Sequence, residues 1–542
     1  MSAQKAISRR RFLKISTQAG AGLVLGVYLS GCQSSAPASP EIRENSFSPN
    51  VYLKISPDDV VTIIVPRMEM GQGVRTALSA LVAEELDANW DSLRIETAPG
   101  DPKYGNQETG GSTSIDTFWM PLREAGALAK NMLITAAAQT WGVDPAACIA
   151  DAGQVVNQND NRRLSYGELA AAAAQLPVPE ADSIPLKSPS DFKLIGQSLK
   201  RVDDPQFVDG SAIFASDIKL PDMRYAAIVR PPVFGATLKS FDAAKAKSIA
   251  GVLDVVEIDN AVAVVAKNTW AALQGQKALQ VSWDEGQYAA LDSETIRQEI
   301  LAQLPKRVTV GNQPAQLQED GGLDVLYEIP NFAHVPMESM NSIAHFKDNA
   351  CQVWAPTQAP QLARTAVYTS VNQGRLATLT NRFNGWSQGA VTINAPLMGG
   401  GFGRRLNVDY AVEAAQVSKA INAPVQVIWT REDDIQHDFY FPMGCYRLRA
   451  PLKAQAKIEG KRYKGPDIIP HGAWRSVQNF SRAYVEESFI DELAHALGQD
   501  PYELRMQRYE DPRLKNVLKL AAEKGDWGSP LPAGWGRGIA AY

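Results

Sequence analysis

Hydrophobic positions along the chain form short apolar runs and longer amphipathic segments. The runs Val60–Val65 and Ala390–Ala395 are short and bounded by turn residues, which predicts strands. Each run leads into a glycine-rich loop. Apolar residues at three- and four-residue spacing follow, over Thr76–Leu86 and Val408–Val417, which predicts amphipathic helices. The chain therefore contains the same arrangement twice: a strand, a glycine loop and a helix N-terminus.

The rest of the pattern mixes both kinds of element. Further strands are expected at Leu93–Thr97, Tyr225–Arg230 and Val262–Ala266. Further helices are expected from about Pro121 to Trp141 and from about Ala483 to Leu497, with Gly498 as the C-cap. At about 150 residues per domain, a chain of 542 residues suggests three or four domains. The sequence therefore predicts a multidomain α+β protein.

Composition and charge narrow the possible functions. Hydrophobic residues make up 45% of the chain and charged residues 21%, as in ordinary globular proteins. The formal net charge is −5 and no basic stripe is present, which argues against a nucleic acid partner. Cys148, Cys351 and Cys445 form no C-x-x-C pair, so no usual iron–sulfur ligand set exists and these thiols are expected to be buried and inert. The five histidines likewise lack zinc-site or iron-site spacing.

The N-terminus has the features of a targeting segment. Twin arginines lie in Ser8–Lys14, and the apolar run Ala19–Leu29 that follows is too short to span a bilayer. The next residues, Leu-Ser-Gly-Cys, are similar to a bacterial lipobox, whose cysteine is lipidated. We therefore expect twin-arginine export to the periplasm and a lipid anchor on Cys32. The alternative is an ordinary amphipathic N-terminal helix. Residues 33–50, rich in Ser, Pro and Ala, are expected to form a tether.

Three glycine-rich loops carry the candidate chemistry. In Met398–Arg405 the glycines allow close backbone approach, the following helix N-terminus favours an anion, and two arginines can donate to phosphate. This loop fits neither the dinucleotide pattern nor a P-loop, and a plain turn with solvated arginines is the alternative. Met68–Gly73 repeats the arrangement and adds the Gln72 amide, although a turn with core methionines would look the same. Gly110–Ser114 can be an anion-binding nest or a simple turn.

These loops occur together with several other short pieces in one order. The further pieces are Lys193–Gly196 with Asp217-Ile218, His334–Glu338, Thr357-Gln358, and Trp474–Val477 with Glu487–Ala494. The set resembles the molybdopterin-binding large subunit of the xanthine dehydrogenase and aldehyde oxidase family. Within that family it is most similar to the isoquinoline 1-oxidoreductase β-subunit type, in which the Met-Gly-Gln-Gly segment lies near the N-terminus. The resemblance covers essentially all of Val51–Tyr542.

The resemblance implies a multidomain α+β fold of the molybdenum hydroxylase large-subunit kind, with an α/β hammerhead domain and mixed α/β cofactor-binding domains. The Pro/Ser-rich composition near residue 180 independently suggests a linker. The expected division is a twin-arginine lipoprotein signal at 1–32, the tether at 33–50, a permuted molybdopterin-binding segment at 51–175, the linker at 176–192, a hammerhead-like domain at 193–290, the first molybdopterin-binding domain at 291–450 and the incomplete start of the second at 471–542.

The resemblance also implies a cofactor and the residues that contact it. The cofactor is a molybdenum–pterin, usually a cytosine dinucleotide in bacterial members, whose metal takes no ligand from protein side chains. The expected contacts are Gly71, Gln72, Gly73, Gly111, Ser112, Gly400, Gly401, Phe402, Gly403 and Arg404. Gln358 resembles the family glutamine that hydrogen-bonds a molybdenum oxo ligand. Arg475 resembles the arginine that faces the substrate, and a structural ion pair is the alternative for it.

The family reaction is hydroxylation of an N-heteroaromatic or aldehyde substrate with oxygen from water, and a glutamate serves as general base. Electrons leave through a small [2Fe–2S] partner subunit, which fits the lack of cluster cysteines here. A membrane cytochrome c is the further acceptor that the resemblance suggests.

The chain departs from the family at the base glutamate. The Gly-x-Gly-Glu motif that carries it is absent, and the stretch between Leu448 and Gly472 is short. Neither Glu338 nor Glu487 is assigned as a substitute. We therefore expect a fragment, a truncated reading frame or a decayed paralogue. The alternatives to an active enzyme subunit are a non-catalytic exported lipoprotein and a nucleotide-binding scaffold without molybdenum.

Overall fold

A computed structural model describes residues 47–180, 183–304, 316–317, 321–371, 390–455, 457–465 and 468–542. It is 38% helical and 23% strand, which confirms the expected mixture of helices and sheets. The expected signal segment with Cys32 and nearly all of the tether lie outside the described residues. Within the described ranges, no helix combines the length and apolar character needed to cross a bilayer.

The N-terminal unit is a four-stranded sheet covered by two helices. Its strand order is β1-β2-β3-β4, with β3 and β4 parallel, and a small sheet β5-β6-β7 is attached to it. Gly126 lets α3 cross closely over α2, because a Cβ there would lie 2.4 Å from the Val82 carbonyl oxygen. The elements are β1 (Phe47–Asn50), β2 (Leu53–Ile55), β3 (Val61–Val65), α2 (Val74–Leu86), β4 (Leu93–Thr97), α3 (Ser114–Trp141), β5 (Cys148–Asp151), β6 (Gln154–Asn157), β7 (Arg163–Ser165) and α4 (Tyr166–Ala173).

The central unit is a seven-stranded mixed sheet of order β10-β11-β8-β18-β15-β16-β17. All six residues of β11 are buried, and alternate residues belong to hydrophobic clusters on opposite faces of the sheet. A two-stranded sheet β12-β9 lies beside it. The elements are α5 (Asp204–Asp209), β8 (Arg224–Val229), β9 (Thr237–Asp242), α6 (Ala244–Lys247), β10 (Val252–Ile258), β11 (Ala261–Ala266), α7 (Thr269–Ala278), β12 (Gln280–Asp284), β15 (Asn341–Lys347), β16 (Ala350–Trp354), α9 (Pro360–Val371), β17 (Val391–Asn394), α11 (Asp409–Ile421), β18 (Val425–Ile428) and α12 (Arg431–Gln436).

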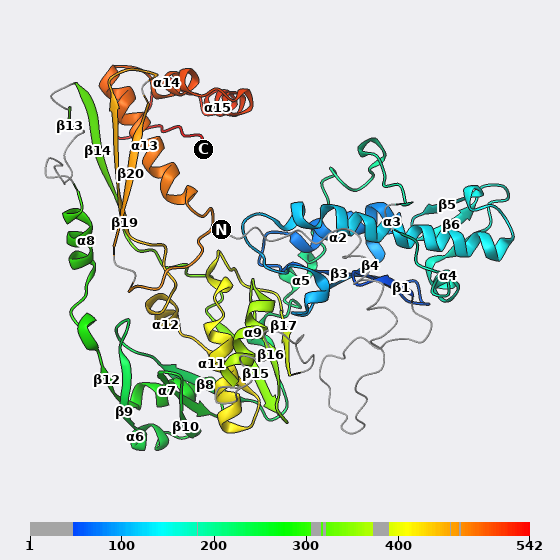
Figure 1. Ribbon diagram of the computed structural model, residues 1–542, viewed down its shortest axis with the longest axis horizontal. Helices are drawn as coiled ribbons and strands as arrows, with labels where there is room; N and C mark the ends of the chain where they lie inside the picture. Colours follow the sequence, from blue (N-terminus) through cyan, green and yellow to red (C-terminus); the bar gives the residue numbers. More distant parts are fainter. Residues whose placement is uncertain are drawn as a thin grey trace.

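The third unit is a four-stranded sheet of order β13-β14-β19-β20, and α13 packs against β14 and β19 around a core that includes Phe489. Figure 1 shows the three units as separate lobes, with the blue-to-cyan N-terminal unit extending to one side of the other two. The elements are α8 (Ser293–Ala302), β13 (Gln316–Leu317), β14 (Gly322–Ile329), β19 (Gly444–Pro451), β20 (Glu459–Lys464), α13 (Asn479–Leu497), α14 (Pro501–Arg508) and α15 (Pro512–Lys524).

The central sheet crosses an expected domain boundary. Strands β8, β10 and β11 come from residues 193–290, whereas β15 to β18 come from residues 291–450. β8 pairs in parallel with β18, with Arg224 opposite Val425, so the two segments share one sheet and do not form two separate domains. Periodicity along a chain cannot reveal which distant strands pair, and this is why the sequence division placed a boundary there.

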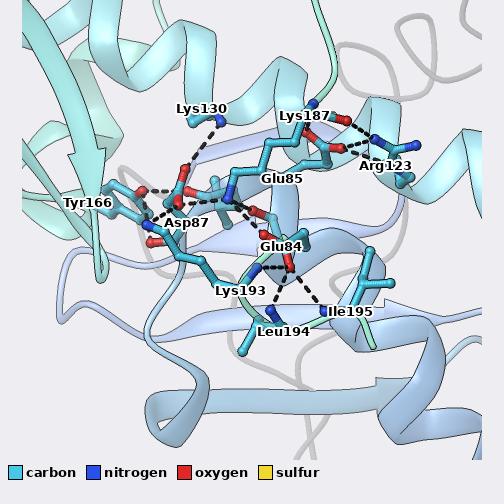
Figure 2. A network of polar contacts seen from close by, with 11 residues as sticks. Glu84, Glu85, Asp87, Arg123, Lys130, Tyr166, Lys187, Lys193, Leu194 and Ile195 are labelled. Carbon is cyan, nitrogen blue, oxygen red and sulfur yellow. Dashed lines mark hydrogen bonds and ion pairs between the residues drawn. The ribbon is translucent and has the colours of Figure 1, made fainter. Parts of the chain in front are cut away.

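The end of the expected linker is held on α2 by buried charges (Figure 2). The Glu84 carboxylate accepts three successive backbone N–H groups, of Lys193, Leu194 and Ile195, at 2.9, 2.7 and 3.1 Å. The Lys187 ammonium donates to Glu84 at 2.9 Å and to Asp87 at 2.8 Å. Burial alone would raise the pKa of Glu84, but the hydrogen bonds from this segment hold that pKa below its ordinary value. The segment 187–195 is therefore fastened to the helix that follows the first glycine loop.

Most expected elements are found within a few residues of their predicted limits. The largest difference is α3, which begins at Ser114, seven residues before Pro121. Pro121 lies in the second turn, where it removes one backbone hydrogen bond without ending the helix. The Gly498 C-cap is confirmed, with φ of 63°. The three cysteines are free and buried, as expected, and burial raises the pKa of Cys351 to about 12.

Candidate functional site

Five loops from distant parts of the chain meet between the N-terminal and central units. Met68 N–H donates to Thr109 Oγ1 at 2.9 Å, and Thr109 N–H donates to the Gln358 carbonyl at 2.8 Å. Met398 N–H donates to the Glu69 carbonyl at 3.3 Å. The glycine loops predicted from the sequence therefore form one site. The five loops are Met68–Gly73 after β3, Gln107–Thr113 before α3, Pro356–Gln358 after β16, Met398–Asn407 between β17 and α11, and His471–Arg475 before α13.

Gln358 is a bridge between these loops. Its side chain is buried, with Nε2 donating to the Thr109 carbonyl at 2.8 Å and Oε1 accepting from Gly403 N–H at 3.0 Å. Its own N–H donates to the Arg405 carbonyl at 2.9 Å. A buried amide bonded at both ends fixes the loops relative to one another. Its contact with a cofactor stays a prediction, and the structure gives it a positioning role.

Two glycines of the loop Met398–Asn407 stand where no side chain fits. A Cβ on Gly401 would lie 2.6 Å from Gln358 Oε1 and 2.7 Å from Met70 Sδ. A Cβ on Gly403 would lie 1.8 Å from the Ala473 carbonyl oxygen. These close approaches bring three other loops into van der Waals contact with this one, and they explain why the sequence needs glycine at both positions.

The same loop has open backbone donors. The N–H groups of Gly400, Gly401 and Phe402 form no hydrogen bond within the part of the chain that the structure describes. Gly400 has φ of 97° and Phe402 has φ of 54°. When left-handed residues alternate with residues of ordinary conformation, their successive N–H groups form a concave nest that binds anions. This stretch therefore fits the anionic part of a phosphate-bearing cofactor.

The loop Met68–Gly73 differs, because several of its N–H groups already have a partner within the chain. The Glu69 carboxylate accepts from Gly71 N–H and Gly73 N–H, both at 2.9 Å, and from Arg75 N–H at 3.1 Å. Gln72 folds back on its own loop, with Oε1 accepting from Met70 N–H at 2.8 Å. The expectation that this loop presents its amides to a phosphate is therefore corrected, because the Glu69 carboxylate occupies the N-terminus of α2.

The two arginines after the glycines are also paired internally, which corrects the expectation that they donate to phosphate. Arg404 is fully buried and donates to both oxygens of Asp409, at 2.9 and 2.8 Å, and its Nε lies 2.9 Å from Asp438 Oδ1. Burial alone would lower the pKa of Arg404, but the charge of Asp409 raises it. Arg405 Nε donates to the Gly400 carbonyl at 2.8 Å. Local sequence could not show these partners, because only folding brings Asp438 close.

Gly111 and Ser112 lie on the exposed surface at the start of α3, both left-handed with φ of 61° and 58°. Thr113, the N-cap, makes no side-chain hydrogen bond to the helix. The first turn of this long helix therefore keeps open N–H groups beside the site, as an anion site requires.

Arg475 is exposed at the edge of the site, next to Trp474. A buried pair that the sequence had not assigned holds this loop: His334 Nε2 donates to the Ala473 carbonyl at 2.8 Å, and His334 Nδ1 lies 3.0 Å from Asp438 Oδ2. Because a carbonyl oxygen only accepts, Nε2 must carry a proton. The run His-x-x-Met-Glu was the sequence signal that pointed to His334.

Glu338 and Glu487 are both engaged in structural contacts. Glu338 accepts from Gly399 N–H at 2.9 Å, inside the site. Glu487 accepts from Arg505 at 2.8 Å and from the Tyr509 hydroxyl at 2.6 Å, which confirms its structural character. It lines a cavity of about 930 Å³ between β19, β20, α13 and the last residues, and none of the five loops contributes to that lining.

One buried cation near the loops has no partner. Arg67, directly after β3, is 1% exposed, and its Nε, Nη1 and Nη2 atoms form no hydrogen bond among the described residues. Buried guanidinium groups are otherwise paired in native structures. An orphaned cation and open amides in neighbouring loops are the features that an anionic cofactor would satisfy, so the residues present fit such a group.

Comparison with known proteins gives two family matches. Residues 2–215 and residues 302–465 each match a molybdopterin cofactor-binding domain. The first match contains the loops Met68–Gly73 and Gln107–Thr113, and the second contains Pro356–Gln358 and Met398–Asn407. The two matched regions thus contribute to the same site.

Similar curated proteins extend over almost the whole chain. A membrane-bound aldehyde dehydrogenase [pyrroloquinoline-quinone] of Gluconacetobacter polyoxogenes is 29% identical, over 98% of this chain and 69% of its own length. Isoquinoline 1-oxidoreductase subunit beta of Brevundimonas diminuta is 27% identical, over 96% of this chain and 78% of its own. Among solved structures, quinoline 2-oxidoreductase from Pseudomonas putida 86 covers 62% of this chain and 54% of its own, with 17% identity and a TM-score of 0.48. This chain therefore spans about half the length of that solved relative.

Proposed function

We propose that this chain holds the cofactor of an enzyme that hydroxylates an N-heteroaromatic or aldehyde substrate with oxygen from water. The chain belongs to the xanthine dehydrogenase family of molybdenum-cofactor-binding large subunits, and these proteins are oxidoreductases. The observation that supports this most directly is the meeting of the two matched regions. Thr109 and Gln358, one from each region, form two hydrogen bonds at the centre of the site: Thr109 N–H donates to the Gln358 carbonyl, and the Gln358 side-chain amide donates to the Thr109 carbonyl. Neither region alone contains all the loops.

Different residues of this chain would then bind the cofactor, position its loop and contact the substrate. The open N–H groups of Gly400, Gly401 and Phe402 would bind an anionic part of a molybdenum–pterin, in its cytosine dinucleotide form. Gln358 would keep that loop in place. Exposed Arg475 would stabilise negative charge that develops on the substrate ring. When bound, the cofactor supplies two-electron oxidation, and electrons would pass to a [2Fe–2S] partner subunit and from there to a membrane cytochrome c.

Export and anchoring complete the proposal. The twin arginines in Ser8–Lys14 and the Leu-Ser-Gly-Cys segment support folded export to the periplasm, with lipid attached to Cys32. Cys32→Ser should move the full chain from the membrane fraction to the soluble periplasmic fraction. Membrane retention of that variant would refute a lipid anchor on this residue.

The central experiment measures the cofactor and the reaction in the protein from its natural host. We expect about one molybdenum per chain, release of a pterin cytosine dinucleotide, and dye-linked oxidation of a quinoline or an aldehyde with ¹⁸O from labelled water in the product. Arg475→Ala should lower kcat for the heterocycle more than it raises KM, because the charge that Arg475 stabilises develops only during the reaction. Pyrroloquinoline quinone is measured in parallel, because the name of one relative includes it. Quinone without molybdenum would refute the proposal, and molybdenum without turnover would favour a non-catalytic cofactor-binding protein.

A further inference from the structure

Arg67 is a buried cation without a hydrogen-bond acceptor among the described residues. All three of its side-chain nitrogens lack a hydrogen-bond partner among the described residues, although the residue is 1% exposed. Burial lowers its pKa, and the charge of Glu108 only partly opposes that effect. Leaving a cation buried and unpaired is strongly destabilising, so such a group normally has a partner in the functional state.

The place of Arg67 shows which partner is missing. Its guanidinium lies over the ring of Phe118, 5.2 Å from the ring centroid, and Phe118 is in the first turns of α3. The charge of Glu108, in the loop that leads into α3, acts on the guanidinium. The next residue of the chain, Met68, donates its N–H to Thr109 of that loop at 2.9 Å. Arg67 therefore lies beside the loop that leads into α3 and the first turns of that helix.

The segment Gly110–Thr113 and the first turn of α3 offer backbone N–H groups that can donate to the same anion as Arg67. Gly111 and Ser112 are exposed and left-handed, and the N-cap Thr113 leaves the first N–H groups of a 28-residue helix without a side-chain partner. A helix N-terminus and a buried guanidinium both favour a compact anion with several oxygens. The N-terminus of α2 offers no second site of this kind, because Glu69 already occupies it.

We propose that Arg67 and the segment Gly110–Thr113 at the start of α3 form the subsite for the diphosphate group of the cofactor. The subsite deepens the proposed function and rests on it. Gly110 and Gly111 carry no side chain, so the backbone of the segment can lie close to the diphosphate. Arg67 then gains the partner that the protein alone does not provide.

Inorganic pyrophosphate is the probe, added to the full chain produced in cells that cannot make the molybdenum cofactor. Pyrophosphate should raise the thermal midpoint of the wild-type apoprotein and should slow hydrogen exchange in peptides that cover residues 108–118. Arg67→Met should weaken pyrophosphate binding at least 30-fold. Its own thermal midpoint without ligand should be equal to or above that of the wild type, because the unpaired charge is gone. A merely structural arginine would lower that midpoint when removed.

Two further variants and one further ligand sharpen the outcome. Arg67→Lys keeps the charge without the planar fork and should bind pyrophosphate with intermediate affinity. Glu108→Gln removes the nearby negative charge and should strengthen binding several-fold. Inorganic phosphate should bind at least ten-fold more weakly than pyrophosphate. Equal binding of the two ligands would mean a general anion site and would overturn the diphosphate assignment.

The cofactor itself gives the second readout. Protein from the natural host should contain molybdenum, whereas the Arg67→Met protein should contain less than a tenth as much. Wild-type affinity for pyrophosphate in Arg67→Met would overturn the inference even where the wild-type protein carries molybdenum. Absence of molybdenum from the wild-type protein would instead refute the proposed function, so the two failures are distinguishable.

Discussion

Gly403→Ala is the sharpest test of how the loops fit together. Gly403 has φ of 106°, where a side chain is strained by roughly 1–3 kcal/mol. The new Cβ would also lie 1.8 Å from the Ala473 carbonyl oxygen, about half of a normal contact distance, so the backbone must move. That movement breaks the hydrogen bond from Gly403 N–H to Gln358 Oε1, which costs a further 1–3 kcal/mol or so because the acceptor stays buried. We expect these two effects to lower the free energy of unfolding by roughly 2–6 kcal/mol in total.

Gly498→Ala is the matched control. It has φ of 63°, but a Cβ there meets nothing within 4 Å, so only the backbone term of about 1 kcal/mol applies. Hydrogen exchange read by mass spectrometry gives the local opening free energy in peptides around each position, which suits a multidomain chain better than one global midpoint. Exchange around residues 399–407 should accelerate by at least about 25-fold in Gly403→Ala. Equal effects in the two variants would refute the close approach of the loops.

Two further predictions concern charges outside the glycine loops. Burial raises the pKa of Asp434 to about 6 and lowers the pKa of His437 to about 4. Protonated Asp434 contributes stability that is lost as pH rises from about 4 to 6. Neutral His437 contributes stability that is lost as pH falls from about 6.5 to 4. Each effect changes the free energy of unfolding by up to about 3 kcal/mol. The wild-type unfolding free energy should therefore stay nearly flat over this range. His437→Gln should lose stability toward pH 6 and Asp434→Asn should lose it toward pH 4; parallel profiles for all three proteins would contradict these assignments. Glu84→Ala should lower the free energy of unfolding by roughly 3–5 kcal/mol and expose residues 187–195 to limited proteolysis, because it removes the acceptor of three N–H groups and of a buried lysine. Substitution of the exposed Glu168 by Ala serves as the control. Equal cleavage of the two variants would contradict the role of Glu84 in holding this segment.

Local features of the site could be predicted from the sequence, because they depend on neighbouring residues. A glycine loop between an apolar run and a periodic segment predicts a strand–loop–helix unit, and Met68–Gly73 and Met398–Arg405 both have that form in the structure. The close approaches at Gly401 and Gly403 are the physical reason for the glycines. The convergence of the loops was expected only through family resemblance, since no spacing along the chain places Thr109 beside Gln358.

Which groups remain free for a ligand could not be predicted, because that depends on long-range pairing. Arg404 has the sequence context of a phosphate ligand, yet Asp438 and Asp409 use its donors. Arg67 has an unremarkable context between Pro66 and Met68, yet its donors have no hydrogen-bond acceptor among the residues that the structure describes. The sequence shows which residues can donate hydrogen bonds, and only the fold shows which donors are already satisfied.

The three loops with anion-binding character therefore differ in what they can do, although their sequences are alike. The N-terminus of α2 is already neutralised by Glu69, so it holds the loop in shape and repels a further negative group. The stretch Gly400–Phe402 has open N–H groups, and no unpaired cation lies beside it among the described residues, so it would suit an anionic part of the cofactor with less charge than the diphosphate. The start of α3 has open N–H groups and the unpaired Arg67 beside it, which suits a doubly charged diphosphate. A dinucleotide cofactor carries both kinds of group at fixed separation, so under the proposed assignment its pterin would lie toward Gln358 and its diphosphate toward α3.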